Sequence, residues 1–479
     1  MRRALTLALL LLASPAFADD LAGFDEPARR ADVRTAAGDD LEGFESGAPE
    51  GDYGWLAAPG KQVSPGSDPA AGSFDVNGSL TLAHWYAPSR NEPRPGEPDW
   101  RGTERLRASL RLDAKMELAA RWEAIVGAAG YIDEVYQLRG AADYPASTRQ
   151  TEESELELRE GYLRGPLVEG VDLAVGRQIV VWGTSDTLRV VDVVNPLDNR
   201  APGMTDIEDL RLPVGMARLD GYSGDWRLTA LYIPEVRIDK SPADGAPFDP
   251  FPSVPAPAEQ RPDSGEDNAA YAVAAKGVFT GWDLSFHAAS YTDRSGRIDL
   301  IRGPVGPTPV RVYDRLTMVG MAGDMAAGPW LVKGELARIG GVRFASLPER
   351  EFARLDVMVG VEYYGIAQTS VAVEIADRRM LGYEGVMGEG SMGIDEDEWV
   401  TALRLSADRL RDRLHLKGVG LLFGLDGAKG SMARLSIGYD VMTATTVTLG
   451  YAAYQGGTSP LWSAYDDRDT LFAEIKRSF

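Results

Sequence analysis

The chain of 479 residues contains no cysteine and only three histidines, His84, His287 and His415. Without cysteine there are no disulfides, so packing and hydrogen bonds alone must hold the fold. The histidines lie far apart in the sequence and, in the absence of thiols, give no metal-ligand spacing. We therefore expect no metal and no cofactor.

Long apolar runs and positive charge are also scarce. After residue 18 no run of about 18 apolar residues occurs, so no transmembrane helix is expected. Lys and Arg number 50 against 72 Asp and Glu, which gives a net charge of −22. Charge of this sign repels phosphates and excludes nucleic acid as an expected partner.

Glycine and aromatic residues are abundant instead, with 53 Gly, 18 Tyr and 10 Trp. A chain rich in glycine and aromatics that lacks membrane helices has the composition typical of membrane β-barrels. A secreted β-solenoid is the alternative, but the body of the chain shows no fixed repeat period.

The N-terminus has the three parts of a signal peptide. A basic start at Met1–Arg3 precedes the apolar residues 4–13, and Ala16-Phe17-Ala18 offers small residues for cleavage before Asp19. The apolar part is too short to span a bilayer as a helix. Residues 1–18 are thus predicted to be a cleavable signal peptide, and the protein is predicted to reach the outer membrane of a Gram-negative cell.

Residues 19–71 show little periodicity and are predicted to form a flexible acidic periplasmic arm. Within it, Asp19–Glu26 (DDLAGFDE) is repeated in similar form as Asp39–Ser46 (DDLEGFES). Acidic residues around a Leu and a Phe suggest that 19–46 docks a periplasmic partner. The alternative is a solvated tether with incidental similarity.

From residue 72 to 479 the pattern has period two, which predicts an all-β transmembrane antiparallel β-barrel. The clearest segment, residues 105–118, places Leu and Ala on one face and charged residues on the other. Such a strand suits a wall between lipid and a watery lumen. We predict about 18 strands, with 16 as the alternative count. The expected strands are 72–86, 103–119, 121–133, 152–164, 170–182, 208–222, 225–236, 268–279, 281–292, 309–325, 329–342, 350–364, 366–377, 397–409, 412–424, 430–442, 444–455 and 467–479.

The connections between these segments alternate between short and long. The long ones include 183–207 and 237–267. Short periplasmic turns and long outer loops are typical of outer-membrane barrels, and an even strand number leaves both ends of the barrel in the periplasm. The last strand ends on Phe479, which resembles the insertion signal read by the barrel-assembly machinery. Arg477 departs from the hydrophobic residue usual in such signals.

The densest unusual stretch runs from Val175 to Asp198. Simple alternation puts Arg177 on the lipid face, whereas a bulge at Gly176 would turn it inward. After Gly183 the segment contains too many aliphatic residues for a solvated loop, which predicts a segment folded into the barrel mouth. The candidate constriction residues are Arg177, Gln178, Trp182, Asp186, Arg189, Asp192 and Asn195.

One predicted strand carries a row of positive charge on its lumen face, formed by Arg105, Arg107, Arg111 and Lys115. Such a row can set the solute preference of a pore. The alternative is that these residues pair across strands with acids such as Glu153, Glu155 and Glu157 and rigidify the wall.

The segment GRQIVVWGTSDTLRVVDVVNPLDNR, residues 176–200, resembles the signature of a domain-of-unknown-function family of proteobacterial outer-membrane proteins. This family is distantly similar to the alginate export porin. A weaker match begins at Tyr232–Arg237 and continues to Pro250. The resemblance implies a porin-like barrel over residues 72–479 and a link to an inner-membrane RND-type exporter of lipid-like cargo.

Catalysis is not expected, because no histidine lies near Ser185 and Asp186, and a hydrolase needs a base within hydrogen-bond reach of its nucleophile. The acidic run Gly393–Glu398 reads as a solvated loop rather than a Ca²⁺ site. The sequence thus predicts an outer-membrane channel in contact with lipid. The alternatives are a structural or adhesive barrel with a filled lumen and, as a minor one, a barrel-embedded hydrolase.

Overall fold

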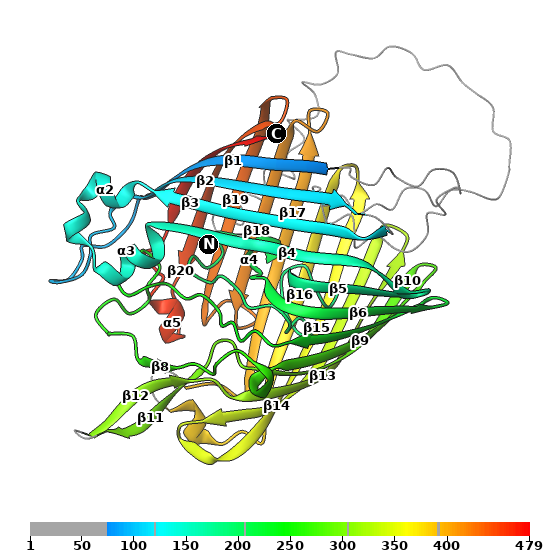
Figure 1. Ribbon diagram of the computed structural model, residues 1–479. Coiled ribbons are helices and arrows are strands. Elements are labelled where there is room, and N and C mark those ends of the chain that lie inside the picture. Colours follow the sequence, from blue (N-terminus) through cyan, green and yellow to red (C-terminus); the bar gives the residue numbers. More distant parts are fainter. Residues whose placement is uncertain (1–73, 119–120, 206, 304–305, 390–392) are drawn as a thin grey trace. The chain divides into compact units, whose positions relative to one another are not determined.

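The computed structural model describes residues 74–118, 121–205, 207–303, 306–389 and 393–479. The predicted signal peptide and acidic arm lie outside these residues. In the described part, an antiparallel sheet of 18 strands forms a closed barrel (Figure 1). Its strands are β1 (Phe74–Ala87), β2 (Gly102–Glu117), β3 (Glu123–Asp133), β4 (Ser154–Val168), β5 (Val171–Gln178), β6 (Val214–Ser223), β7 (Trp226–Ile233), β9 (Ala270–Phe279), β10 (Trp282–Thr292), β13 (Arg315–Ala327), β14 (Trp330–Phe344), β15 (Leu347–Ile366), β16 (Thr369–Leu381), β17 (Asp397–Arg409), β18 (Leu414–Phe423), β19 (Gly430–Met442), β20 (Thr445–Gln455) and β21 (Thr470–Ser478).

The barrel closes between its first and last strands. β1 pairs with β21 in a register that places Ser79 opposite Ser478 and Tyr86 opposite Leu471. Beyond β21, the backbone N–H of Phe479 donates to the carbonyl of Gly78 at 2.9 Å. Leu471, Ile475 and Phe479 are exposed on the outer face, as the alternation predicts. The role of Phe479 as an insertion signal stays a prediction.

The two faces of each strand follow from the period-two pattern. On β2, Leu106, Leu110 and Leu112 are exposed on the outside, while Arg107 and Arg111 make ion pairs on the inside. Because a barrel has no free sheet edge, every wall strand finds backbone partners on both sides. The apolar outer face and the polar inner face agree with the sequence prediction.

The connections give the barrel a short-turn end and a long-loop end. β4 and β5, β6 and β7, β9 and β10, and β19 and β20 are joined by two-residue turns, and β1 starts and β21 finishes at this same end. The opposite end carries the helices α2 (Val135–Arg139), α3 (Ala146–Glu152) and α5 (Pro460–Ser463), seen on the left of Figure 1. In the described residues, no helix is long and apolar enough to cross a membrane.

Several predicted strand limits were wrong. The strand predicted at 170–182 ends at Gln178, because residues 179–182 leave the wall and pack inside the barrel. The strand predicted at 208–222 begins only at Val214. Segments predicted as plain loops, and the start of the strand predicted at 309–325, instead form a second sheet of three strands, β8 (Ala258–Gln260), β11 (Arg297–Gly303) and β12 (Gly306–Val312).

The main apolar cluster lies inside the barrel rather than between sheets. It joins aliphatic residues of the segment 179–213 to the inner wall of strands β6 to β16. Wall residues in this cluster are small or flexible, such as Ala322, Ala337 and Met358. Small side chains on the wall leave room for an inserted segment, so the core of this barrel is built around its own loop.

Candidate functional site: a loop folded into the barrel

The connection between β5 and β6, residues 179–213, is named the inner loop here. Its apolar residues Val180, Trp182, Val190, Val191 and Val194 are each at most 6% exposed. They pack against the inward faces of β6, β7, β9, β10 and β13–β16. Burial of this surface, at roughly 25 cal/mol per Å², accounts for the aliphatic residues in a loop. The structure thus places the predicted segment inside the barrel.

Glu335 on β14 holds the first turn of the inner loop. Its carboxylate accepts the backbone N–H groups of Thr184 at 2.6 Å, Ser185 at 2.8 Å and Val191 at 3.1 Å. The residue is only 4% exposed. A buried carboxylate is stabilised when several N–H groups donate to it, so Glu335 and the loop backbone satisfy each other.

Glu374 on β16 holds the next residues in the same way. It accepts the backbone N–H groups of Asp186 at 2.9 Å, Thr187 at 3.1 Å and Leu188 at 3.1 Å. The hydroxyl of Ser185 donates to it at 2.7 Å. Two wall carboxylates therefore bind the backbone of residues 184–191.

The side chain of Asp186 points to a group of charges on the neighbouring wall. Arg404 on β17 donates to Asp186 at 2.7 Å, and Lys333 on β14 also donates to it. Both cations contact Glu362 on β15, at 3.0 and 3.1 Å. The two cations and two carboxylates of this group balance one another, so Asp186 is buried together with compensating charge.

Asn195 ties the two halves of the inner loop together. Its Oδ1 accepts the N–H of Val180 at 2.8 Å, and its Nδ2 donates to the carbonyl of Leu212 at 2.8 Å. It is fully buried, and Gln178 beside it is 2% exposed. Nearby, Asp192 accepts from Arg189 at 3.2 Å and from Arg211 at 2.9 Å. The candidate residues Gln178, Trp182, Asp186, Arg189, Asp192 and Asn195 thus lie within one folded unit.

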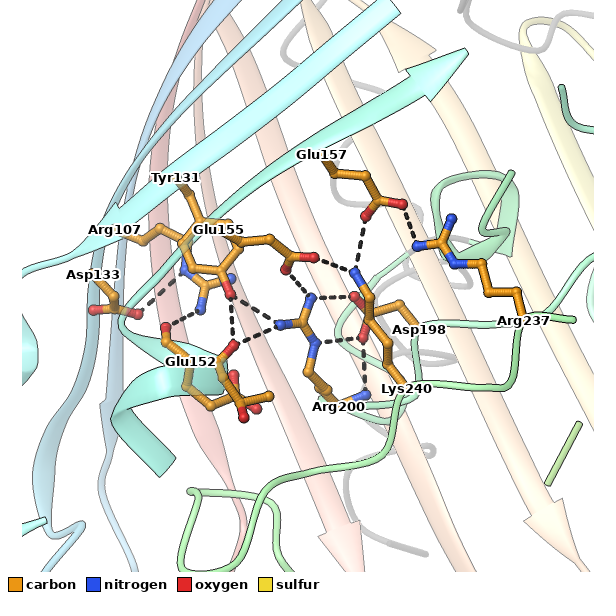
Figure 2. A network of polar contacts seen from close by, with 11 residues as sticks. Arg107, Tyr131, Asp133, Glu152, Glu155, Glu157, Asp198, Arg200, Arg237 and Lys240 are labelled. Atoms are coloured by element: carbon orange, nitrogen blue, oxygen red, sulfur yellow. Dashed lines mark hydrogen bonds and ion pairs between the residues drawn. The ribbon is translucent and has the colours of Figure 1, made fainter. Parts of the chain in front are cut away.

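A second anchor joins Arg200 of the inner loop to side chains on β3 and β4 (Figure 2). Its guanidinium donates to Glu155 at 2.7 Å, to Asp198 at 2.8 Å and to the hydroxyl of Tyr131 at 3.0 Å. Burial tends to raise the pKa of Asp198, but the hydrogen bonds and charge of Arg200, together with the charge of Lys240, outweigh burial and hold that pKa below its usual value of 3.8.

A third contact lies on β19 and β20, which stand between the other two anchors in the strand order around the barrel. The hydroxyl of Tyr454 on β20 donates to the carbonyl of Pro202 at 2.6 Å, and Arg434 on β19 donates to that of Met204 at 2.6 Å. Ala201 and Met204 pack with Trp85 and Phe472 of β1 and β21. The inner loop therefore crosses the lumen and is attached on three sides.

The connection between β7 and β9, residues 234–269, is named the mouth loop. Phe248 at its turn is 1% exposed and packs with Trp85, Tyr454 and Tyr465. Carbonyls of the turn accept side-chain donors from other connections, including Trp100 to Gly245 at 2.9 Å and Arg468 to Asp249 at 3.0 Å. Phe248 is thus an internal anchor of this loop.

Arg177 keeps the simple alternation. It lies opposite Gly161 and Gly215 with no register shift at Gly176, on the same face as the exposed Val175. The alternative of a bulge that turns it inward was wrong. At this end of β5 its charge is met by an ion pair with Glu235, so no isolated charge faces outward.

The basic row on β2 has partners other than those predicted. Arg105 and Arg107 contact Asp133 at 3.5 and 3.3 Å, Arg111 contacts Asp113 at 2.7 Å, and Lys115 contacts Glu123 at 2.9 Å. The alternative of cross-strand pairing is thus confirmed for Arg105, Arg107 and Lys115, but the partners are Asp133 and Glu123 rather than Glu153, Glu155 and Glu157. Arg107 lies directly opposite Asp133 in the β2–β3 register, whereas Glu155 and Glu157 bind the loop cations Arg200, Lys240 and Arg237.

A serine–histidine pair that the sequence analysis did not consider lies on β10. Nε2 of His287 is 2.9 Å from the hydroxyl of Ser285, and Trp182 covers the ring. Nδ1 of His287 has no hydrogen-bond partner in the described residues, so the carboxylate that orients the imidazole in catalytic triads is lacking there. Among the described residues, no group of three or more His, Asp or Glu could hold a metal ion.

Sequence reasoning placed Glu374 on the lumen face but did not link it to the loop, and it did not single out Glu335 or Arg200. Alternation gives the face of a wall residue but not its height relative to an inserted segment. Glu335 lies 150 or more residues from Ser185 and Thr184 in the sequence, so only the folded structure shows that it accepts hydrogen bonds from them.

The closed 18-stranded barrel with an inserted loop is the architecture of porin-like outer-membrane proteins. Solved structures with this fold include OccAB3 of Acinetobacter baumannii, at 11% identity and a TM-score of 0.50, covering 85% of this chain and 99% of that one. A BenF-like porin from Pseudomonas fluorescens Pf-5 also matches, at 11% identity and a TM-score of 0.50, covering 85% of this chain and 98% of that one.

Residues 99–372 match the family described as protein of unknown function (DUF1302). This match covers more than half of the chain, which therefore belongs to the DUF1302 family. A search of curated proteins finds no match. The predicted link to the alginate export porin stays a prediction.

Proposed function

We propose that the chain forms an outer-membrane channel for a solute, with the inner loop as its constriction. The observation that carries this proposal is the binding of residues 184–191 by Glu335 and Glu374. A loop held inside a barrel by buried carboxylates narrows the lumen at a fixed height, and in this proposal solute passes beside it.

The lining toward the short-turn end supports a polar solute. Inward side chains there keep solvent contact although they are paired: Lys115 is 46% exposed, Arg111 36% and Arg164 32%. The aliphatic residues of the inner loop, in contrast, are buried against the wall. Charged side chains in a wet lumen favour passage of hydrated, polar solutes and disfavour lipid.

The resemblance to exporter-linked proteins implies a hydrophobic or lipid-like cargo received from an RND-type exporter. The contact with such an exporter, or with another periplasmic partner through residues 19–46, falls on residues outside the described structure. Both remain predictions of the sequence. Lipidomic comparison of outer-membrane extracts with and without the gene tests the lipid cargo, because loss of a lipid exporter changes the lipid composition.

Single-channel recording in planar bilayers tests the channel. The full chain is compared with a variant that lacks residues 183–207, and heat-modifiable gel mobility confirms that both are folded. We expect small discrete currents from the full chain and larger currents from the deletion variant. A folded deletion variant that stays silent would contradict the proposal, because something other than the inner loop would then block the lumen.

A barrel with a filled lumen is a second candidate, favoured by the attachment of the inner loop on three sides. The contacts at Glu335, Arg200 and Tyr454 leave this loop little freedom to move. Such a barrel would be silent as the full chain and would conduct only after deletion of residues 183–207. A silent full chain therefore assigns a structural or adhesive role, in which the long loops bind an external partner.

A further inference from the structure

Three arginines lie on the outer face of the barrel at its short-turn end: Arg409 on β17, Arg413 just before β18, and Arg477 on β21. Arg409 lies opposite Leu414 of β18, and Leu414 lies opposite Tyr439 of β19, which is exposed. Directly opposed residues of paired strands share one face of the sheet, so Arg409 is on the outer face with Tyr439. The guanidinium of Arg413 lies 5.0 Å from the centre of the Tyr439 ring. Arg477 shares the face of Ile475, which is 49% exposed.

These arginines donate to neutral oxygen atoms only. Arg409 donates to the carbonyl of Gln368 at 3.1 Å, Arg413 to that of Asp440 at 2.9 Å, and Arg477 to that of Thr443 at 2.7 Å. None of them forms an ion pair with another described residue. The charge of Arg413 also acts on the nearby carboxylate of Asp440, whereas no ion pair with a described residue takes up the charges of Arg409 and Arg477.

Three arginines at the long-loop end differ in this respect, although Arg315 at that end also donates to neutral oxygen atoms only. Arg343 pairs with Glu351, Arg350 with Glu384, and Arg379 with Glu396. In a chain with a net charge of −22, acids are plentiful, so a group of arginines without acidic partners is unexpected by chance. The two groups thus differ in their partners, because Arg343, Arg350 and Arg379 are neutralised by acids.

The turn between β17 and β18 adds a fourth arginine in an unusual backbone. Leu410, Arg411 and Asp412 have φ values of 55°, 58° and 59°, the left-handed conformation that non-glycine residues adopt at a cost. The N–H of Arg413 closes the turn on the carbonyl of Arg409 at 3.1 Å. The turn leaves Leu410 62% exposed beside Arg411. An apolar residue next to an arginine suits the interface between acyl chains and headgroups.

We propose that Arg409, Arg411, Arg413 and Arg477, spread along the short-turn ends of β17 to β21, form a basic band that binds the phosphates of several anionic phospholipids in the leaflet at this end. Guanidinium groups bind phosphate with strong charge-assisted hydrogen bonds. The exposed Tyr439, Ile437 and Leu435 continue along the same face and would contact the acyl chains. This continuity of charge and apolar surface favours a lipid over a soluble anion. The inference goes beyond the channel function and does not depend on conduction.

The test is native mass spectrometry of the full chain in detergent, titrated with phosphatidylglycerol or phosphatidylcholine. The test variant is R411Q/R413Q/R477Q, and R411Q alone serves as a second variant because Arg411 makes no described contact that folding would need. The matched control, R343Q/R350Q/R379Q, removes the same charge at the opposite end. Heat-modifiable gel mobility shows which variants are folded.

We expect the wild type and the control to prefer phosphatidylglycerol, and each arginine lost at the short-turn end to lower that preference by about fivefold. An unchanged preference in R411Q and in the folded triple variant would overturn the proposal. Displacement of phosphatidylglycerol by an equal concentration of inorganic phosphate, or of a peptide with the sequence of residues 19–46, would also overturn it. Those outcomes would assign the arginines to a free anion or to the acidic arm.

Discussion

The carboxylate of Glu374 on β16 accepts the backbone N–H of Asp186 at 2.9 Å. This bond joins the wall to a loop residue 188 positions away in the sequence. Because Glu335 binds the preceding residues in the same way, the inner loop depends on two wall carboxylates for its position. Four predictions follow from this and related contacts.

Replacement of both anchors in E335Q/E374Q should free residues 184–191 from the wall. Each amide keeps one acceptor oxygen but adds an N–H, so several loop N–H groups lose their partner, at a cost of about 1–3 kcal/mol each. We expect a larger and noisier single-channel current than that of the wild type. E384Q, which changes an exposed rim glutamate, is the control and should leave the current unaltered. Equal currents from all three proteins would refute the role of the anchors.

N195A should destabilise the barrel by about 1–3 kcal/mol, because it leaves the N–H of Val180 and the carbonyl of Leu212 buried without a partner. Urea unfolding followed by tryptophan fluorescence measures the loss. The control is N268A, since Asn268 is only half-buried and its side chain makes a single bond to the Asp263 carbonyl. A loss no greater than that of N268A would show that Asn195 does not hold the loop.

F248A should release the mouth loop, because a fully buried phenylalanine contributes about 3–5 kcal/mol to packing. Limited proteolysis should then cut within residues 244–269 much faster than in the wild type. F251A is a close control three residues away, where the side chain is 43% exposed. Cleavage at the same rate in F248A and F251A would contradict the anchoring role.

Acid should weaken the attachment of the inner loop at Arg200. The pKa of Asp198 is lower in the folded protein than its usual 3.8, so ionised Asp198 stabilises the fold above that pH. The contribution is lost as the pH falls below 3.8 through the folded pKa. Urea unfolding from pH 6 downward should show this loss in the wild type, and D198N should lack that part of it. Parallel pH profiles of the two proteins would count against the prediction.

Much of the fold could be predicted because alternation is local. Lipid on one side and water on the other force each wall strand to repeat with period two, so residues such as Leu106 and Arg107 reveal their faces without a partner in view. Strand limits were less certain where apolar residues leave the wall, as at Val180 and Trp182. There the aliphatic residues belong to a buried loop, and periodicity cannot distinguish such a loop from a strand of the wall.

The candidate site was predictable in position but not in its contacts. The unusual segment after Gly176 marked the loop, yet the pairing of Arg107 with Asp133 and of Glu157 with Lys240 depends on register and on the path of other loops. Charge alone allows many such pairings. Geometry selects one because only side chains at the same height on the inner wall can meet.

By itself the sequence determined a barrel wall, its two faces, its approximate strand number and the segment that leaves the wall. These are properties that neighbouring residues set through the pleat and the solvent on each side. The tertiary structure alone decided which carboxylates receive that segment, because Glu335 and Glu374 reach residues 184–188 only after the sheet has closed. It also decided that Arg409, Arg413 and Arg477 lie on the outer face at the same end of the barrel, because the antiparallel register of β17 to β21 brings these positions to that end.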